Sequence, residues 1–237
     1  MRKIYNISTE QATPSIESVL GGQGIPRSLK PDERTVKLAE EAISSFRQIA
    51  KPVGILMEIS KHNFESISIG EGRNKIDSPI NPIYLSSDSL ALFAVTVGEE
   101  VCSEISERFN KNDFALGSML DSAASEGTEM TAQTIEDIYL RHLIETGKSN
   151  TDSGILRFSP GYCGWHISAQ QKLFQALHPE DIRITLNDSF LMQPLKSISG
   201  VIIFGRKKIF DFDDNFSFCI DCKTHTCRDR VQAVNKY

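Results

Sequence analysis

No stretch of the 237 residues approaches the roughly 20 consecutive apolar residues that a helix needs to cross a bilayer, so we expect no membrane partner. Clustered positive charge is also lacking: 26 Lys and Arg stand against 31 Asp and Glu, a formal net charge of −5. Because phosphate contacts need a basic surface, we expect no nucleic-acid partner either. The N-terminal residues MRKIYNISTEQATPS lack the apolar core of a secretory signal, which favours a cytoplasmic protein.

Cysteine is sparse and its number is odd, which argues against a disulfide framework. The five cysteines are Cys102, Cys163, Cys219, Cys222 and Cys227. The last three follow a C-x2-C-x4-C spacing, and thiolates at such a spacing favour zinc or an iron–sulfur cluster. Cys163 or His225 is the candidate fourth ligand. The alternative is a group of reduced surface thiols or a C-x2-C redox pair.

Repeats and low-complexity tracts are absent, and apolar periodicity divides the chain into helices and strands. We expect an irregular lead-in over 1–30, an α+β domain over 31–212 and a Cys-rich tail over 213–237. The spacing predicts helices from 31 to about 50, over 113–146 and over 168–177, and strands over 53–59, 155–158, 182–185, 189–192 and 201–204. The apolar run 88–97 leaves open where the next helix begins. Helices then dominate the first two thirds and strands the last, which favours α+β.

Glu126 lies in the long predicted helix on the same stripe as Met119, Ala123 and Met130. Burying an ionised carboxylate is unfavourable unless it is paired. One interpretation is a boundary residue that reaches water or an internal arginine. The other is a carboxylate held for a cationic ligand, with Gly127 letting that ligand approach the helix backbone.

The segment RFSPGYCGWH, residues 157–166, also has two interpretations. Pro160-Gly161 is typical of a type II turn, and an arginine at a strand end is usually solvated. However, the planar guanidinium of Arg157 suits a carboxylate, and Tyr162 offers a flat wall. Together, Glu126 and Arg157 would suit an amino acid or a sulfonium zwitterion.

Several motifs occur in an order that resembles the activation domain of cobalamin-dependent methionine synthases. LFAVT at 92–96 is similar to the family's FAVT run, and Glu126 matches an acidic residue of its long helix. RFSPGY at 157–162 is similar to Arg-x-Ala-Pro-Gly-Tyr. LNDSFLMQP at 186–194 and SISG at 197–200 resemble "ESFAMxP…SVSG". The resemblance covers about 53–210 and implies a twisted, mainly antiparallel sheet with a long central helix and flanking helices.

The resemblance also implies a function. A domain of this family binds S-adenosylmethionine in a shallow groove and docks onto a corrinoid-carrying domain, where inactive cob(II)alamin is reductively methylated. By this resemblance Arg157 holds the ligand's carboxylate, Glu126 its ammonium, and Ser159, Gly161 and Tyr162 line the groove. The expected partners are a corrinoid-binding methyltransferase subunit and an electron donor such as a flavodoxin or ferredoxin.

Three departures from the family pattern leave alternatives open. The first 30 residues hold no aspartate that aligns with the family's ligand contact, the substrate, folate and corrinoid modules are absent, and the C-terminal cysteines are additional. We expect a stand-alone reactivation protein. The alternatives are a non-catalytic module that binds corrinoid protein or senses S-adenosylmethionine, with structural zinc at the cysteines, and a component of a zinc-dependent homocysteine methyltransferase.

Overall fold

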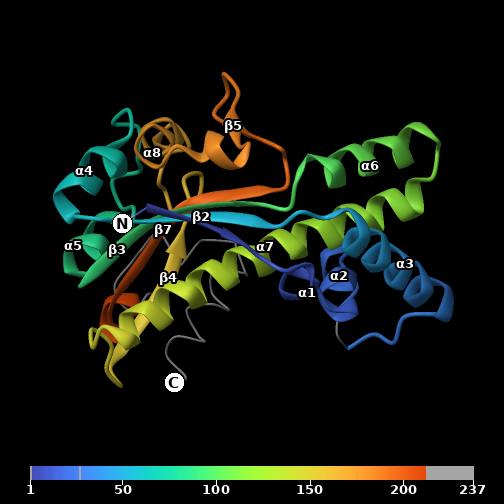
Figure 1. The fold of residues 1–237 in the computed structure, drawn as a ribbon, viewed down its shortest axis with the longest axis horizontal. Helices are drawn as coiled ribbons and strands as arrows, with labels where there is room; N and C mark the ends of the chain where they lie inside the picture. Colours follow the sequence, from blue (N-terminus) through green and yellow to red (C-terminus); the bar gives the residue numbers. More distant parts are fainter. Residues whose placement is uncertain (1, 27, 212–237) are drawn as a thin grey trace.

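The protein is built around one antiparallel sheet that its longest helix crosses (Figure 1). The computed structural model describes residues 2–26 and 28–211. The strands are β1 (Arg2–Asn6), β2 (Val53–Ile59), β3 (Ser89–Thr96), β4 (Ser153–Phe158), β5 (Thr185–Leu186), β6 (Met192–Gln193) and β7 (Ser197–Arg206). The α-helices are α1 (Thr9–Ala12), α2 (Ile16–Gly22), α3 (Glu33–Ile49), α4 (Lys61–Ile69), α5 (Ile80–Ser86), α6 (Glu99–Asn110), α7 (Phe114–Glu145) and α8 (Ala169–Leu177). The 3-10 turns are η1 (Pro179–Ile182) and η2 (Lys207–Phe210).

The main sheet has the strand order β1-β2-β3-β7-β4, with each neighbouring pair antiparallel. β5 and β6 form a separate two-stranded ribbon. This confirms the predicted α+β class, with its antiparallel sheet, long central helix and flanking helices. Among the described residues, no helix combines the length and the apolar character needed to span a membrane.

Strand β3 shows why the sheet is covered on both faces. Leu90, Leu92 and Ala94 belong to the core cluster under α4, α5 and α8, whereas Phe93 and Val95 belong to the cluster under α7. Successive strand residues point to opposite faces, so an apolar residue at every position requires helices on both sides. For the same reason the run 88–97 has no two-residue period, and the sequence alone did not separate strand β3 from helix α6.

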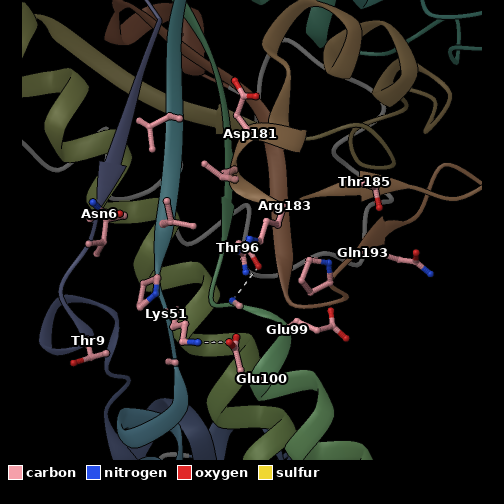
Figure 2. A pocket seen from close by; sticks show the side chains of 18 residues that line it. Asn6, Thr9, Lys51, Thr96, Glu99, Glu100, Asp181, Arg183, Thr185 and Gln193 are labelled. Carbon is pink, nitrogen blue, oxygen red and sulfur yellow. Dashed lines mark hydrogen bonds and ion pairs between the residues drawn. The ribbon is translucent and has the colours of Figure 1, made fainter.

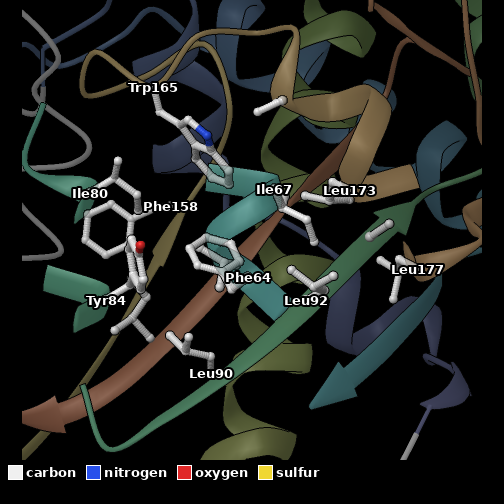
Figure 3. Close-up of a cluster of buried hydrophobic side chains, with 14 of the residues drawn as sticks. Phe64, Ile67, Ile80, Tyr84, Leu90, Leu92, Phe158, Trp165, Leu173 and Leu177 are labelled. Atoms are coloured by element: carbon white, nitrogen blue, oxygen red, sulfur yellow. The ribbon is translucent and has the colours of Figure 1, made fainter. Parts of the chain in front are cut away.

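The face of the sheet covered by α4, α5 and α8, here called the α8 face, carries the aromatic core of the domain (Figure 3). Phe64 of α4 lies edge-on to Tyr84 and to Trp165, with ring centroids 5.1 Å and 5.8 Å apart. Trp165 is only 1% exposed, so the segment that follows β4 is anchored by the largest side chain of the protein.

Helix α7 has 32 residues, which at 1.5 Å per residue gives about 48 Å. Its C-terminal half packs Ile135, Tyr139 and Leu143 under the sheet. Its N-terminal half extends beyond the sheet and packs Leu120 and Ala123 against α1, α2, α3 and α6. The long helix therefore joins two apolar clusters that the sheet alone does not connect.

The N-terminal residues differ from the irregular lead-in expected over 1–30. Arg2–Asn6 pairs with β2 as an edge strand, and α1 and α2 bury Ala12, Val19 and Leu20 against α7. A serine caps the N-terminus of each short helix: the side chains of Ser8 and Ser15 each accept a hydrogen bond from the backbone N–H three residues later. Strands β1, β2 and β3 also precede residue 97, so the expected concentration of strands in the last third was wrong.

The other elements agree with the sequence predictions to different degrees. The predicted strands at 53–59 and 155–158 and the predicted helices at 31–50, 113–146 and 168–177 are confirmed as β2, β4, α3, α7 and α8. The strands expected over 182–185 and 189–192 are reduced to the two-residue strands β5 and β6. Asn187 accounts for part of this difference, because its side-chain oxygen accepts hydrogen bonds from the N–H groups of Ser189 and Leu191 and stabilises a turn.

Candidate functional site

Arg157, near the end of β4, is the best-defined charged residue of the candidate site. It pairs in register with Ile202 of β7, which belongs to the cluster under α7. Its side chain therefore faces the long helix, and it is only 4% exposed. Nη2 donates to Glu129 Oε2 at 3.4 Å and Nη1 donates to Gln133 Oε1 at 3.2 Å. Nε lies 3.7 Å from Glu136 Oε2.

These three partners of Arg157 were not predicted from the sequence. Glu129, Gln133 and Glu136 follow one another at spacings of four and three residues, which places them on one face of α7. That polar stripe was the available signal. Glu129 is half exposed at 51% of its side chain, whereas Glu136 is 9% exposed, so the two acids differ in their access to water.

Glu126 lies about one turn before Glu129 on the same helix and is partly buried. Burial raises the pKa of its carboxyl, and the negative charge of Glu129 raises that pKa further. A positive group bound beside Glu126 would act in the opposite direction and lower the pKa. The predicted stripe was only partly right, since Met119 and Ala123 are buried but Met130 is 41% exposed.

Gly127 faces packed neighbours and does not open the helix to a ligand, which was one interpretation of the sequence. A Cβ at this position would lie 2.3 Å from Cζ of Phe46 and 3.0 Å from the carbonyl oxygen of Ala12. Phe46 of α3 is fully buried. The absence of a side chain at Gly127 therefore allows α3 and α1 to pack closely on α7.

The segment after β4 forms the type II turn that Pro160-Gly161 predicts. Gly161 has a φ of +96°, and the Tyr162 N–H donates to the Ser159 carbonyl at 3.2 Å. The Gly161 N–H donates to the Trp165 carbonyl at 2.7 Å. Because Trp165 is buried on the α8 face, the turn is held in place while the Tyr162 ring stays 59% exposed.

Three of the four predicted metal ligands lie outside the residues that the structure describes. Cys219, Cys222 and Cys227, and the tail predicted over 213–237, lie outside them. Cys163 is half-buried in the turn with a φ of +52°. Within residues 2–26 and 28–211, no group of three or more His, Cys, Asp or Glu side chains is arranged to hold a metal ion. The zinc or iron–sulfur site stays a prediction.

A cavity of about 880 Å³ lies elsewhere, at the end of β1, β2 and β3, and extends to η1 and the start of α6 (Figure 2). Its charged lining includes Lys51, Glu100 and Arg183. Lys51 makes an ion pair with Glu100 and lowers its pKa, and Arg183 adds a smaller effect in the same direction. None of the residues predicted for the ligand site lines this cavity. Ile4 of its lining pairs with Ile55 of the α8-face cluster, so the cavity lies on the other side of the sheet from Arg157.

Comparisons with known proteins agree on one type of domain. Residues 80–213 match a family model described as the activation domain of vitamin B12-dependent methionine synthase. The fold is similar to a crystal structure of the MetH reactivation domain bound to AdoHcy, with a TM-score of 0.59 and 16% sequence identity over 86% of this chain and 78% of that one. A search of curated proteins finds no match. The matched span of the family model runs from the start of α5 to three residues beyond η2 and includes the Arg157 site.

Proposed function

The chain belongs to the family of vitamin B12-dependent methionine synthase activation domains, and on that premise we propose that it binds S-adenosylmethionine and supports reductive methylation of cob(II)alamin on a partner corrinoid protein. The reaction consumes S-adenosylmethionine and one electron from a donor such as a flavodoxin or ferredoxin. It leaves S-adenosylhomocysteine, and the methyl group is on the cobalt of the partner.

The observation that carries this proposal is the arrangement of Arg157 between β4 and the acidic face of α7. Its planar guanidinium suits the carboxylate of an amino acid. Glu129 now contacts Nη2 at 3.4 Å, and its half-exposed side chain can be displaced because water solvates it when it leaves. A ligand carboxylate can therefore take its place at Nη2.

The acidic residues on α7 suit the positive groups of the same ligand. Once Glu129 leaves Arg157, its carboxylate and that of Glu126 lie about one helical turn apart with like charges. Burial and the charge of Glu129 raise the pKa of Glu126, and a cation bound between the two carboxylates would lower it. The ammonium and the sulfonium of S-adenosylmethionine supply two positive charges. With Glu136 remaining beside Nε of Arg157, the guanidinium is matched to the ligand's carboxylate, and Glu126 and Glu129 are matched to its two cations.

The turn at Ser159, Gly161 and Tyr162 forms the outer wall of the proposed groove. Ser159 directly follows β4, and beside Gly161 the nearest heavy atom to an added Cβ is Ile167 Cδ1, 4.0 Å away. The backbone there is open to close approach by a ligand. The exposed ring of Tyr162 offers an apolar surface for the nucleoside or for the partner's corrin. S-adenosylmethionine supplies the reactive methyl group, so the protein's part is binding, orientation and charge.

Isothermal titration with S-adenosylmethionine and S-adenosylhomocysteine tests the proposal. We expect saturable binding by the wild type and at least a tenfold loss in Arg157→Lys, which keeps the charge but not the planar fork. Arg206→Ala is the matched control because Arg206 is exposed at the end of β7. Absence of binding by the wild type, or equal affinity in Arg157→Lys, would contradict the proposal. A reconstituted mixture with corrinoid protein and reductant then measures methyl transfer, and binding without transfer would indicate a sensing module.

A further inference from the structure

We propose that Glu136 is a positioning residue that fixes the Arg157 guanidinium for the incoming carboxylate, with Gln133 as its bridge. The inference rests on the proposed function for the identity of the ligand only. The positioning itself concerns contacts within this chain.

Polar side chains of α7 surround the Arg157 guanidinium. Nε of Arg157 lies 3.7 Å from Glu136 Oε2, and Nη1 donates to Gln133 Oε1 at 3.2 Å. Gln133 Nε2 in turn donates to Glu136 Oε1 at 3.1 Å and to Asp137 Oδ1 at 2.9 Å. Both amide hydrogens of Gln133 thus point at carboxylates, so its carbonyl oxygen must face the guanidinium. All three nitrogens of Arg157 therefore face side chains of α7: Nη1 and Nη2 make hydrogen bonds, and Nε makes an ion pair with Glu136.

The two acidic partners of Arg157 differ in how deeply they are buried. A buried guanidinium needs a charged partner, because removing one member of a buried pair leaves an uncompensated charge. Glu136, at 9% exposure, has little water to move into. Glu129, at 51% exposure, can move into water. We therefore assign Glu136 as the fixed counter-ion of Nε and Glu129 as the exchangeable group at Nη2.

The difference in burial between Glu136 and Glu129 fixes the orientation in which Arg157 meets a ligand. A guanidinium on a flexible side chain loses rotamer entropy when it binds a carboxylate. With Nε and Nη1 already held, Arg157 presents the Nη2 edge in one orientation before the ligand arrives. Replacing Glu136 by glutamine keeps the size but removes the charge, so the guanidinium should turn toward Glu129 and bind a ligand carboxylate less well.

Affinity for S-adenosylhomocysteine, measured by titration in wild type, Glu136→Gln, Glu136→Asp and Glu145→Gln, tests the role. Glu145 is the exposed last residue of the same helix, so its variant is the matched charge control. We expect at least tenfold weaker binding in Glu136→Gln, a smaller loss in Glu136→Asp, and a change below twofold in Glu145→Gln. 5′-Methylthioadenosine, which has neither the carboxylate nor the ammonium, should bind all four proteins equally when followed by ligand-observed NMR.

A ligand-independent measurement keeps the two proposals distinguishable. In ¹⁵N-labelled protein the Arg157 Nε–H signal should exchange slowly in the wild type and rapidly in Glu136→Gln, with both proteins folded by circular dichroism. Unchanged affinity and unchanged exchange in Glu136→Gln would overturn the positioning role, as would an equal loss for both ligands. If the wild type bound no S-adenosylhomocysteine but Nε–H exchange still depended on Glu136, the ligand proposal would fail and the positioning role would stand.

Discussion

Replacing Gly127 by alanine tests how the two halves of the domain are joined. The added Cβ would lie 2.3 Å from Cζ and 2.8 Å from Cε2 of the buried Phe46 ring, and 3.0 Å from the Ala12 carbonyl oxygen. None of these atoms is the far end of a flexible chain, so α3 must shift. In an exposed helix the same change is favourable by about 1 kcal/mol, so the two effects oppose each other.

The destabilisation from the steric clash of the added Cβ is expected to exceed the gain in helix propensity. Overfilling a well-packed core typically costs about 1–3 kcal/mol, and the short contacts place Gly127→Ala near the upper end. Subtracting the helix gain leaves a net loss of about 2 kcal/mol. For a chain of this size that lowers the melting temperature by about 4–8 °C.

Urea unfolding followed by circular dichroism measures the change, with Gly21→Ala as the control. Gly21 lies in α2 with no heavy atom within 4 Å of an added Cβ, so this variant should be as stable as the wild type or slightly more stable. Adding Phe46→Leu to Gly127→Ala should recover about 1 kcal/mol relative to the sum of the single changes. A Gly127→Ala protein more stable than the wild type would refute the packing account, and a selective loss of ligand affinity would restore the ligand-approach interpretation.

Three further predictions concern the sheet and two titrating groups. Gly200→Ala should be destabilised by more than about 3 kcal/mol or yield no folded protein, since its Cβ would lie 2.1 Å from the Phe158 carbonyl oxygen; expression and urea unfolding measure this, and wild-type stability would contradict it. Burial and the charge of Glu129 raise the pKa of Glu126 in the folded protein. The protonated carboxyl therefore favours folding at pH values below its ordinary pKa, and this stabilisation is lost as the pH rises through the raised pKa. In thermal melting, Glu126→Gln should be more stable than the wild type at pH 7 but not at pH 4, and it should bind S-adenosylmethionine less tightly. Burial raises the pKa of Tyr139 to about 12, so stability should fall between pH 10 and 12 as unfolding releases its proton, and a Tyr139→Phe protein with an equally steep decline would show that Tyr139 is not responsible.

The sequence predicts the elements whose patterns are long or uninterrupted. Helix α7 keeps helical spacing over 32 residues, and β2 is an apolar run bounded by polar segments. Helices α1 and α2 were not predicted, because helices of four and seven residues are too short to show a periodic pattern of apolar residues. Their serine caps are the only local signal, and their stability comes from packing on α7.

The candidate site was predictable on the strand side and less so on the helix side. Arg157 stands out because it lies at a strand end, three residues before Pro160-Gly161. On α7, Glu126 and Glu129 are separated by about 300° around the axis, which leaves them only about 60° apart. Which of the two meets Arg157 depends on how the helix is rotated against β4. That rotation is set by Ile135 and Tyr139 under the sheet, a tertiary contact that no local spacing encodes.

Arg157 and Phe158 are consecutive residues that project to opposite sides of β4, one toward the acidic helix and the other into the aromatic cluster around Trp165. If Arg157 binds the ligand as proposed, substitutions on its side of β4 can change ligand preference while the hydrophobic residues on the other side stay unchanged. To alter ligand preference, positions 129, 133 and 157 should be varied together, while Leu156 and Phe158, whose side chains lie in the core on the other face of β4, are kept.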